Sequence, residues 1–154
     1  MTRELEIYFD GACRGNPGPA AIGVVIYDEG QKIKEVAKEI GEGTNNIAEY
    51  SALLHALNEA KQLNGKRIKF YTDSELLAKQ VTGKYKVKNE KIKLLFEQVA
   101  KLSRDFEHIE IKHVPREKNK EADFLATEIL KKKQAKVVAP LFHHSGEESP
   151  SSTG

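Results

Sequence analysis

Four acidic residues have the types and positions that suit metal chemistry. Asp10 and Asp73 each follow an alternating apolar stretch. Glu49 and Asp123 each lie early in a stretch with helical apolar spacing. Acids gathered at one edge of a sheet repel one another unless a cation joins them. Mg²⁺ binds a few carboxylates together with substrate phosphate, and two ions about 3.5–4 Å apart support in-line displacement at phosphorus. The acids therefore predict a divalent-metal site that cleaves phosphodiesters.

Each acid also has a simpler explanation. Asn46 and Glu49 have the N-cap to N3 spacing of a capping box. Asp73 could cap the helix that follows it, and Asp10 could be a turn residue. Asp123 could stabilise a helix N-terminus through the macrodipole. Four acids at compatible topological positions are poorly explained by four independent accidents, so the metal site is the favoured hypothesis.

The elements that would position these acids follow from hydrophobic periodicity. Alternating or β-branched runs predict strands over residues 5–10, 21–27, 33–40, 68–72 and 108–114. The segment 11–19, rich in Gly and Pro, is predicted to be a turn. Apolar stripes predict helices from about Asn46 to a stop at Gly65, over 74–81 with a stop at Gly83, around 92–102, and after Asn119, which can cap the last helix.

This order, βββαβααβα, predicts a mixed sheet with helices on its faces and hence an α/β fold. Hairpins make the first three strands antiparallel, and helical crossovers lay the last two parallel to the first. Asp10 and Asp73 would then lie at one sheet edge, on neighbouring strands about 4.8 Å apart. Ligand sites in open α/β sheets lie at such an edge, where the strand order changes direction.

The composition describes an ordinary water-soluble domain. The chain has 154 residues, of which 39% are hydrophobic and 31% charged, with a net charge of +2. No apolar run approaches the roughly 20 residues that span a bilayer, and the N-terminus shows no signal-peptide pattern. The single Cys13 excludes an internal disulfide, fits a reducing compartment and is expected to be a packing residue. We therefore expect a cytoplasmic protein without a membrane segment.

Other chemistries lack support in the sequence. No Cys/His cluster suggests zinc, and His143-His144 is expected to be incidental. No Gly-rich loop ends in Lys-Ser or Lys-Thr, as nucleotide triphosphate binding would require. Lysines cluster at 84–93 and 131–136. Such runs are usually solvated helix faces, but the first could be a phosphate-contacting rim opposite the acids.

The domain boundary is set by where the helical pattern fades. We expect a catalytic domain over residues 1–133 and a tail over 134–154 that is partly docked or disordered. The apolar residues 137–142 could dock on the body, whereas 145–154 are Ser-, Gly- and Glu-rich.

Four motifs together resemble the type 1 ribonuclease H family (ribonuclease HI). They are Asp10-Gly11-Ala12-Cys13-Arg14-Gly15-Asn16-Pro17-Gly18-Pro19, Thr44-Asn45-Asn46-Ile47-Ala48-Glu49, Tyr71-Thr72-Asp73-Ser74 and Asn119-Lys120-Glu121-Ala122-Asp123. The resemblance covers the chain to about residue 130. It implies a ribonuclease H-like fold with a five-stranded mixed sheet. It also implies cleavage of the RNA strand of RNA–DNA hybrids with two Mg²⁺ or Mn²⁺ ions per site, leaving 5′-phosphate and 3′-hydroxyl ends.

The resemblance also implies roles for individual residues. The metal ligands would be Asp10, Glu49, Asp73 and Asp123. Contacts to the hybrid would come from Gly11, Cys13, Asn16, Asn45 and Asn46 in the minor groove, with Thr44 on a DNA phosphate. Amides suit this task because they bond a 2′-hydroxyl as donor or acceptor, and that hydroxyl separates RNA from DNA. Helix capping is the alternative for Asn45 and Asn46.

Two departures from the family pattern make this a short form. The loop 114–119 has no Gly-His pair. Arg116 is the candidate substitute, acting on the scissile phosphate or leaving group, and His113 is the second choice with a possible structural role. The basic protrusion is reduced to residues 83–89, with Tyr85 among lysines and no Trp in the chain. The expected partner is an RNA–DNA hybrid bound by a monomer.

Three alternatives stay open. The first is a binding module that keeps the fold without catalysis, which the intact acid set disfavours. The second is a nuclease of the same fold with another substrate, such as duplex RNA or branched DNA. The third is a non-catalytic α/β domain with scattered surface acids, which predicts no stabilisation by Mg²⁺.

Overall fold

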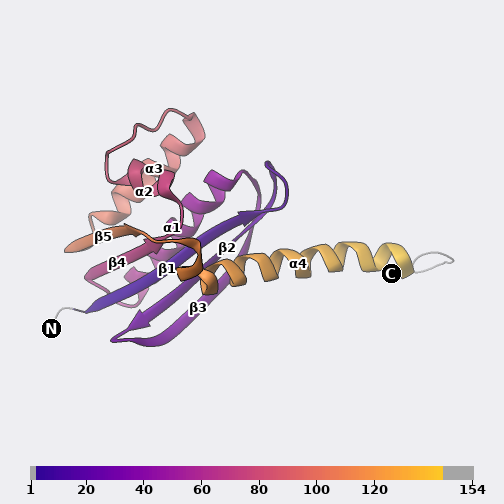
Figure 1. Ribbon diagram of the computed structural model, residues 1–154, viewed down its shortest axis with the longest axis horizontal. Coiled ribbons are helices and arrows are strands. Elements are labelled where there is room, and N and C mark those ends of the chain that lie inside the picture. Colours follow the sequence, from indigo (N-terminus) through magenta and orange to yellow (C-terminus); the bar gives the residue numbers. More distant parts are fainter. Residues whose placement is uncertain (1–2, 144–154) are drawn as a thin grey trace.

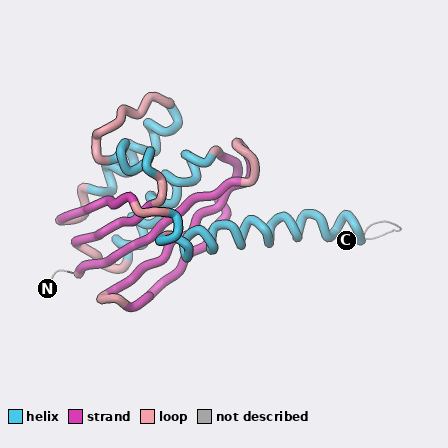
Figure 2. Tube along the Cα trace, viewed as in Figure 1, coloured by secondary structure: helices cyan, strands magenta, loops and turns pink. Residues whose placement is uncertain are grey.

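The computed structural model describes the backbone of residues 3–143 and the side chains of residues 3–132. In chain order the elements are β1 (Glu4–Cys13), β2 (Gly18–Asp28), β3 (Gln31–Gly43), α1 (Asn45–Gln62), β4 (Arg67–Thr72), α2 (Glu75–Val81), α3 (Glu90–Ser103), β5 (His108–His113), the 3₁₀ turn η1 (Arg116–Lys118) and α4 (Lys120–His143). Figure 2 shows the strands side by side, with helices on both sides of them.

The five strands form one mixed sheet in the order β3-β2-β1-β4-β5. The β1–β2 and β2–β3 pairs are antiparallel, and the β1–β4 and β4–β5 pairs are parallel. The predicted α/β fold with a five-stranded mixed sheet is confirmed. The direction of the strand order changes at β1, so the carboxyl ends of β1 and β4 form the predicted site edge.

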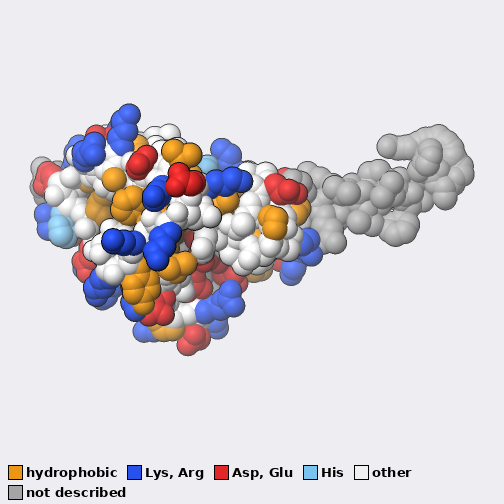
Figure 3. Space-filling model, turned by 90° about the horizontal axis from the view of Figure 1, so that it is seen from above, with side chains coloured by type: hydrophobic (Ala, Val, Ile, Leu, Met, Phe, Trp, Pro, Cys, Tyr) orange, Lys and Arg blue, Asp and Glu red, His pale blue; other side chains and the backbone are white. Residues whose placement is uncertain are grey.

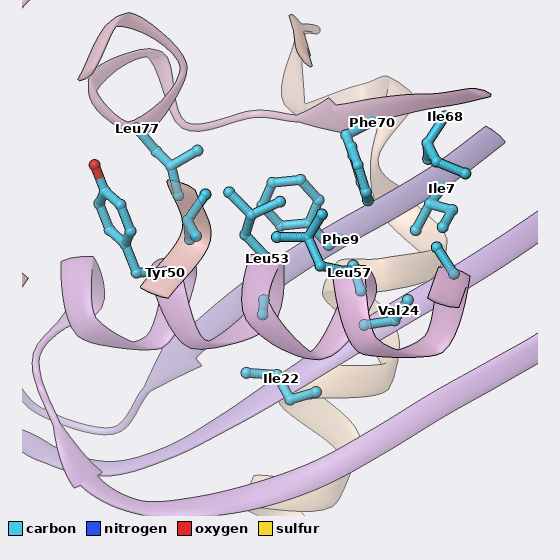
Figure 4. Close-up of a cluster of buried hydrophobic side chains, with 14 of the residues drawn as sticks. Ile7, Phe9, Ile22, Val24, Tyr50, Leu53, Leu57, Ile68, Phe70 and Leu77 are labelled. Carbon is cyan, nitrogen blue, oxygen red and sulfur yellow. The ribbon is translucent and has the colours of Figure 1, made fainter. Parts of the chain in front are cut away.

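The hydrophobic core lies between the sheet and α1. Side chains alternate along a strand, so every second residue of β1 faces this layer, including the fully buried Ile7 and Phe9. Phe9 meets Phe70 of β4 edge to face, with ring centroids 6.2 Å apart. Figure 4 shows Leu53 and Leu57 of α1 directed toward these strand side chains. This packing fixes the height of α1 above the sheet.

The opposite face of the sheet is packed by α4, which contacts β1, β2 and β3. Figure 1 shows α4 crossing these strands on the other side from α1 and then continuing past the sheet. The backbone stays helical to His143, beyond the expected boundary at residue 133. The predicted docking of the 137–142 side chains and the predicted disorder of 145–154 fall outside the described side chains and residues.

Three helix ends considered in the sequence analysis differ from the structure by one or two residues. Thr44 caps α1, with its hydroxyl oxygen accepting from the Ile47 N–H at 3.2 Å, so Asn46 does not cap and no capping box explains Glu49. Ser74, not Asp73, caps α2. At the end of α1 the left-handed residue is Asn64, with φ 61°, rather than Gly65. Several neighbouring residues can cap each end, and tertiary packing decides between them.

The predicted turn over 11–19 is also too long. Strand pairing continues to Cys13 opposite Ala20, so only residues 14–17 connect β1 and β2. The Gly and Pro residues favoured a turn, but the ladder to β2 satisfies the backbone groups of residues 11–13 better than an open loop would.

Gly23 of β2 lets α4 lie directly on the sheet. A Cβ placed on Gly23 would be 2.1 Å from the Ala122 carbonyl oxygen of α4. Because the obstacle is backbone, no side-chain rotation relieves it. We predict that Gly23→Ala lowers the free energy of unfolding by about 3 kcal/mol, the upper part of the range for overpacked sites. Urea denaturation followed by circular dichroism measures this.

Gly30→Ala is the control, since a Cβ there meets nothing within 4 Å and only the φ of 80° is unfavourable. We expect it to cost about 1 kcal/mol. A Gly23→Ala protein as stable as the Gly30→Ala protein would show that α4 does not need this close approach.

Candidate active site

The structure brings three of the four acids together at the predicted edge. Asp10, Glu49 and Asp73 each offer a carboxylate oxygen, and these oxygens lie within 4.8 Å of one another. Asp10 is 5% exposed, and the Asp73 side chain is 9% exposed. A set of only carboxylate oxygens at this spacing suits hard divalent cations such as Mg²⁺ or Mn²⁺.

Strand register places two of these acids. Tyr8 of β1 pairs with Tyr71 of β4, and their rings stack with centroids 4.5 Å apart. Asp10 and Asp73 lie two residues further along the parallel strands, so both point to the same face as the tyrosines. The stacked pair thus supports the register that aligns the two carboxylates.

Glu49 reaches the site because α1 touches the β1 backbone. A Cβ on Gly11 would be 2.2 Å from the Ala48 carbonyl carbon and 2.5 Å from the Glu49 nitrogen. Glycine at position 11 therefore allows the first turns of α1 to pass directly over the end of β1. This contact carries Glu49 next to Asp10.

Asp123 approaches from the other face of the sheet. Asp10 pairs with Gly23, the residue on which α4 lies, and Asp123 is in the first turn of that helix. Asp123 lies within hydrogen-bond reach of Asp10, and this contact helps to raise the pKa of Asp10. Asp123 does not belong to the group of three whose oxygens lie within 4.8 Å. It stands beside that group, in contact with one member.

Two of these acids, Asp10 and Glu49, have raised pKa values. Burial raises the pKa of Asp10 far above its usual range, and the charge of Asp73, the hydrogen bond with Asp123 and the charge of Glu49 raise it further. Burial also raises the pKa of Glu49 to about 7, partly offset by a hydrogen bond from Ser74 and by the charge of Arg116. A divalent cation would favour the deprotonated acids and displace these protons.

The two candidates for the missing loop histidine both lie near this edge. Arg116 starts η1, and its Nε is 3.6 Å from Asp73 Oδ2 although its side chain is 80% exposed. His113 ends β5, pairs with Thr72 and is exposed. Its charge lowers the pKa of Glu75 in α2, after the larger effect of Lys79. Arg116 contacts a site acid, whereas His113 faces α2.

The expected substrate contacts gather where the β1–β2 connection meets the start of α1. The Asn45 backbone N–H donates to Asn16 Oδ1 at 3.0 Å. Cys13 Sγ lies 3.1 Å from Asn45 Oδ1 and 2.6 Å from the Gly15 carbonyl oxygen. Burial, followed by the charge of Glu49, raises the pKa of this thiol. Asn46 is exposed beside them. The result is a polar edge next to the three acids.

Sequence reasoning missed three positioning contacts. Ser74 hydrogen-bonds Glu49 while capping α2. Gly23 seats α4, and a glycine inside a β-branched run was a usable signal for such an approach. The prediction that the Asn119 side chain caps α4 is wrong, because its Oδ1 accepts no hydrogen bond from the helix. Its Nδ2 donates instead to the Phe9 carbonyl at 2.9 Å.

The chain matches one family model and several proteins named ribonuclease H. The family described as reverse transcriptase-like matches residues 8–129. Ribonuclease HI of Halobacterium salinarum is 42% identical over 127 residues, which cover 82% of this chain and 64% of that protein. The chain therefore spans less than two thirds of that relative's length.

Solved structures share the fold closely. The crystal structure of RNase H1 from Halobacterium salinarum has a TM-score of 0.82 at 40% identity, covering 84% of this chain and 98% of that one. LC11-RNase H1, isolated from compost and solved in complex with an RNA/DNA hybrid, has a TM-score of 0.77 at 42% identity, covering 80% and 94%. The chain belongs to the family described as reverse transcriptase-like and, with the RNase H1 structures that match it, to the type 1 ribonuclease H family.

Proposed function

We propose that this protein hydrolyses the RNA strand of RNA–DNA hybrids as an endonuclease, using two divalent cations and leaving 5′-phosphate and 3′-hydroxyl ends. The observation that carries the proposal is the group of three carboxylates within 4.8 Å at the carboxyl edge of β1 and β4. Relatives named ribonuclease HI and a similar structure solved with an RNA/DNA hybrid support the substrate class.

The acids would hold the cations, Mg²⁺ or Mn²⁺, against the scissile phosphate. Asp10, Glu49 and Asp73 supply the oxygens that lie closest together, and Asp123 supplies a fourth carboxylate beside Asp10. When bound, the cations supply charge stabilisation for an in-line displacement. Arg116 lies at the rim, where its exposed guanidinium can bind a phosphate oxygen.

Recognition of RNA would come from the polar edge. Asn16, Asn45 and Asn46 carry amides, and the Cys13 thiol and Gly11 backbone lie on the adjoining strand end. Such groups can sense a 2′-hydroxyl through the minor groove, where a DNA strand has none. Thr44 already caps α1, and its position at the helix start suits a contact with a DNA phosphate.

The segment between α2 and α3 is the candidate rim for the DNA backbone. Lys84, Lys86 and Lys88 are exposed, and no ion pair joins them to any described residue. Lys79 lies over the exposed Tyr85 ring at 5.0 Å from its centroid. Figure 3 shows basic and acidic side chains interspersed over the face seen from above, so these contacts would add local rather than global attraction.

The setting of this activity is also a proposal. Within residues 3–143, no helix is long and apolar enough to cross a membrane. We propose a monomer that acts in the cytoplasm, with a catalytic domain over residues 1–133 and residues 134–154 as its tail.

The first prediction about the proposed function concerns Asp10→Asn. This change replaces a charged carboxylate of the three-acid group by a neutral amide, which binds a divalent cation more weakly. Hybrid cleavage should therefore fall by about 10³-fold or more. The assay follows an end-labelled RNA strand annealed to DNA, with Mg²⁺ or EDTA. Single-stranded RNA, duplex RNA and duplex DNA of matched sequence serve as substrate controls. Wild-type cleavage by the variant would remove Asp10 from the mechanism, and equal cutting of duplex RNA would broaden the substrate class.

The second prediction is a pH-dependent response to Mg²⁺. In the folded, metal-free protein Asp10 and Glu49 have raised pKa values, about 7 for Glu49, against ordinary values near 4 when unfolded. The native state therefore binds more protons, and its free energy of unfolding should fall as pH rises from about 4 through about 9, the folded pKa of Asp10. Stabilisation by Mg²⁺ should grow over the same range because cation and protons compete.

Urea denaturation with and without Mg²⁺, at about pH 5 and about pH 8, measures both trends. Asp10→Asn is the matched control, since it lacks the main titrating group and should be the more stable protein at the higher pH without metal. A wild-type protein that Mg²⁺ stabilises equally at both pH values would contradict the proton-retaining site.

The third prediction separates Arg116 from His113. Arg116→Ala should lower kcat by about tenfold to a hundredfold with little change in KM, because the guanidinium would act on charge that develops at the phosphate. Arg116→Lys should recover part of the rate, since it keeps the charge but loses the planar fork. His113→Ala is measured in parallel. An unchanged kcat in Arg116→Ala, with a loss in His113→Ala, would reverse the assignment.

A further inference from the structure

Asn119 is a buried amide at the junction of the two halves of the site. It lies between η1 and α4 and is 1% exposed. Its Nδ2 donates to the carbonyl oxygen of Phe9 at 2.9 Å, across a sequence separation of 110 residues. Phe9 is the residue before Asp10. The pairing of β1 with β4 ends at Tyr8 and Tyr71, and beyond it Asn119 supplies the donor to β1.

The backbone of Asn119 joins the same junction to two further site residues. Its N–H donates to the Arg116 carbonyl oxygen at 2.9 Å, which closes η1. Its carbonyl oxygen accepts from the Asp123 N–H at 3.1 Å, in the first turn of α4. One residue therefore ties the strand that carries Asp10 to the segments that carry Arg116 and Asp123.

The other half of the amide is unsatisfied. Among the side chains described, those of residues 3–132, Asn119 Oδ1 is the buried oxygen or nitrogen atom without a hydrogen-bond partner. An unpaired buried acceptor lowers stability, and an apolar side chain of similar size would avoid that cost. The Nδ2 donor is therefore the side-chain atom that ties Asn119 to its surroundings.

We propose that Asn119 is a positioning residue, whose bond to Phe9 holds η1 and α4 against β1 so that Arg116 and Asp123 keep their places beside Asp10. The proposal rests on the proposed function for its catalytic consequence, but the geometry it describes also governs cation binding. Contacts that orient the ligands of a metal typically change affinity or activity by about 10–100-fold when they are removed.

The test compares Asn119→Ala and Asn119→Leu with Arg3→Met. Arg3 makes the same kind of long-range bond, from its guanidinium to the Leu63 carbonyl oxygen at 2.6 Å, but beside the opposite end of β1. It also pairs with Asp28. Its loss should destabilise the fold without reaching the acids. Both variants leave the Phe9 carbonyl oxygen without this donor, but leucine fills the space and removes the unpaired oxygen, so it should fold even if the alanine variant does not.

Three quantities are measured for each protein: the free energy of unfolding in urea, the Mn²⁺ affinity by calorimetry without substrate, and kcat and KM on an RNA–DNA hybrid. We expect the Asn119 variants to bind Mn²⁺ about tenfold more weakly and to lose about tenfold or more in kcat, with KM within about twofold. Arg3→Met should lose stability but keep wild-type Mn²⁺ affinity and kcat.

Folded Asn119 variants with wild-type Mn²⁺ affinity and kcat would overturn the proposal. So would equal losses in Arg3→Met, because they would reflect general destabilisation, and so would failure of both Asn119 variants to fold, because that would show a purely structural role. A wild-type protein that binds Mn²⁺ but cleaves no hybrid would instead refute the proposed function. In that case the Mn²⁺ affinities alone would decide the role of Asn119.

Discussion

The repulsion among three closely spaced carboxylates, one of them buried, is the constraint on which the rest of the site depends. Asp10, Glu49 and Asp73 place oxygens within 4.8 Å of one another, and the burial of Asp10 removes water that would otherwise screen its charge. Such a group stays together only if protons or cations neutralise it. Burial first, and the charges of neighbouring acids after it, raise the pKa values of Asp10 and Glu49. The fold must also hold the acids rigidly, because any loosening would let them separate into solvent.

Two glycines next to Asp10 in the sheet provide that rigidity from opposite faces. Gly11 brings the α1 backbone onto β1, and Gly23 brings the α4 backbone onto β2. Glycine inside a strand costs conformational entropy and packs no side chain. Here the cost is offset because a Cβ at either position would push away the helix that carries Glu49 or Asp123. The two helical layers therefore close on the sheet at the point where the acids meet.

Much of this arrangement could be predicted from the sequence because it depends on local patterns. Alternation gave the strands, their order gave the mixed sheet, and the strand ends placed Asp10 and Asp73 at one edge. The helix caps were predicted less well, because neighbouring residues compete and packing decides the outcome, as at Thr44. The bond from Asn119 to Phe9 could not be predicted, since it spans 110 residues and carries no periodic signal.

The site therefore consists of two parts with different mechanical character. The β1, β4 and α1 part is held by strand pairing and by the core, and it fixes the three closest acids. The η1 and α4 part carries Asp123 and an Arg116 side chain that is 80% exposed, free to exchange Asp73 for a phosphate. The exposed Arg116 guanidinium can be placed accurately only if the backbone of η1, which carries it, is held in position. The buried amide of Asn119 holds that backbone, because it bonds the segment after η1 to the carbonyl of Phe9, the residue before Asp10.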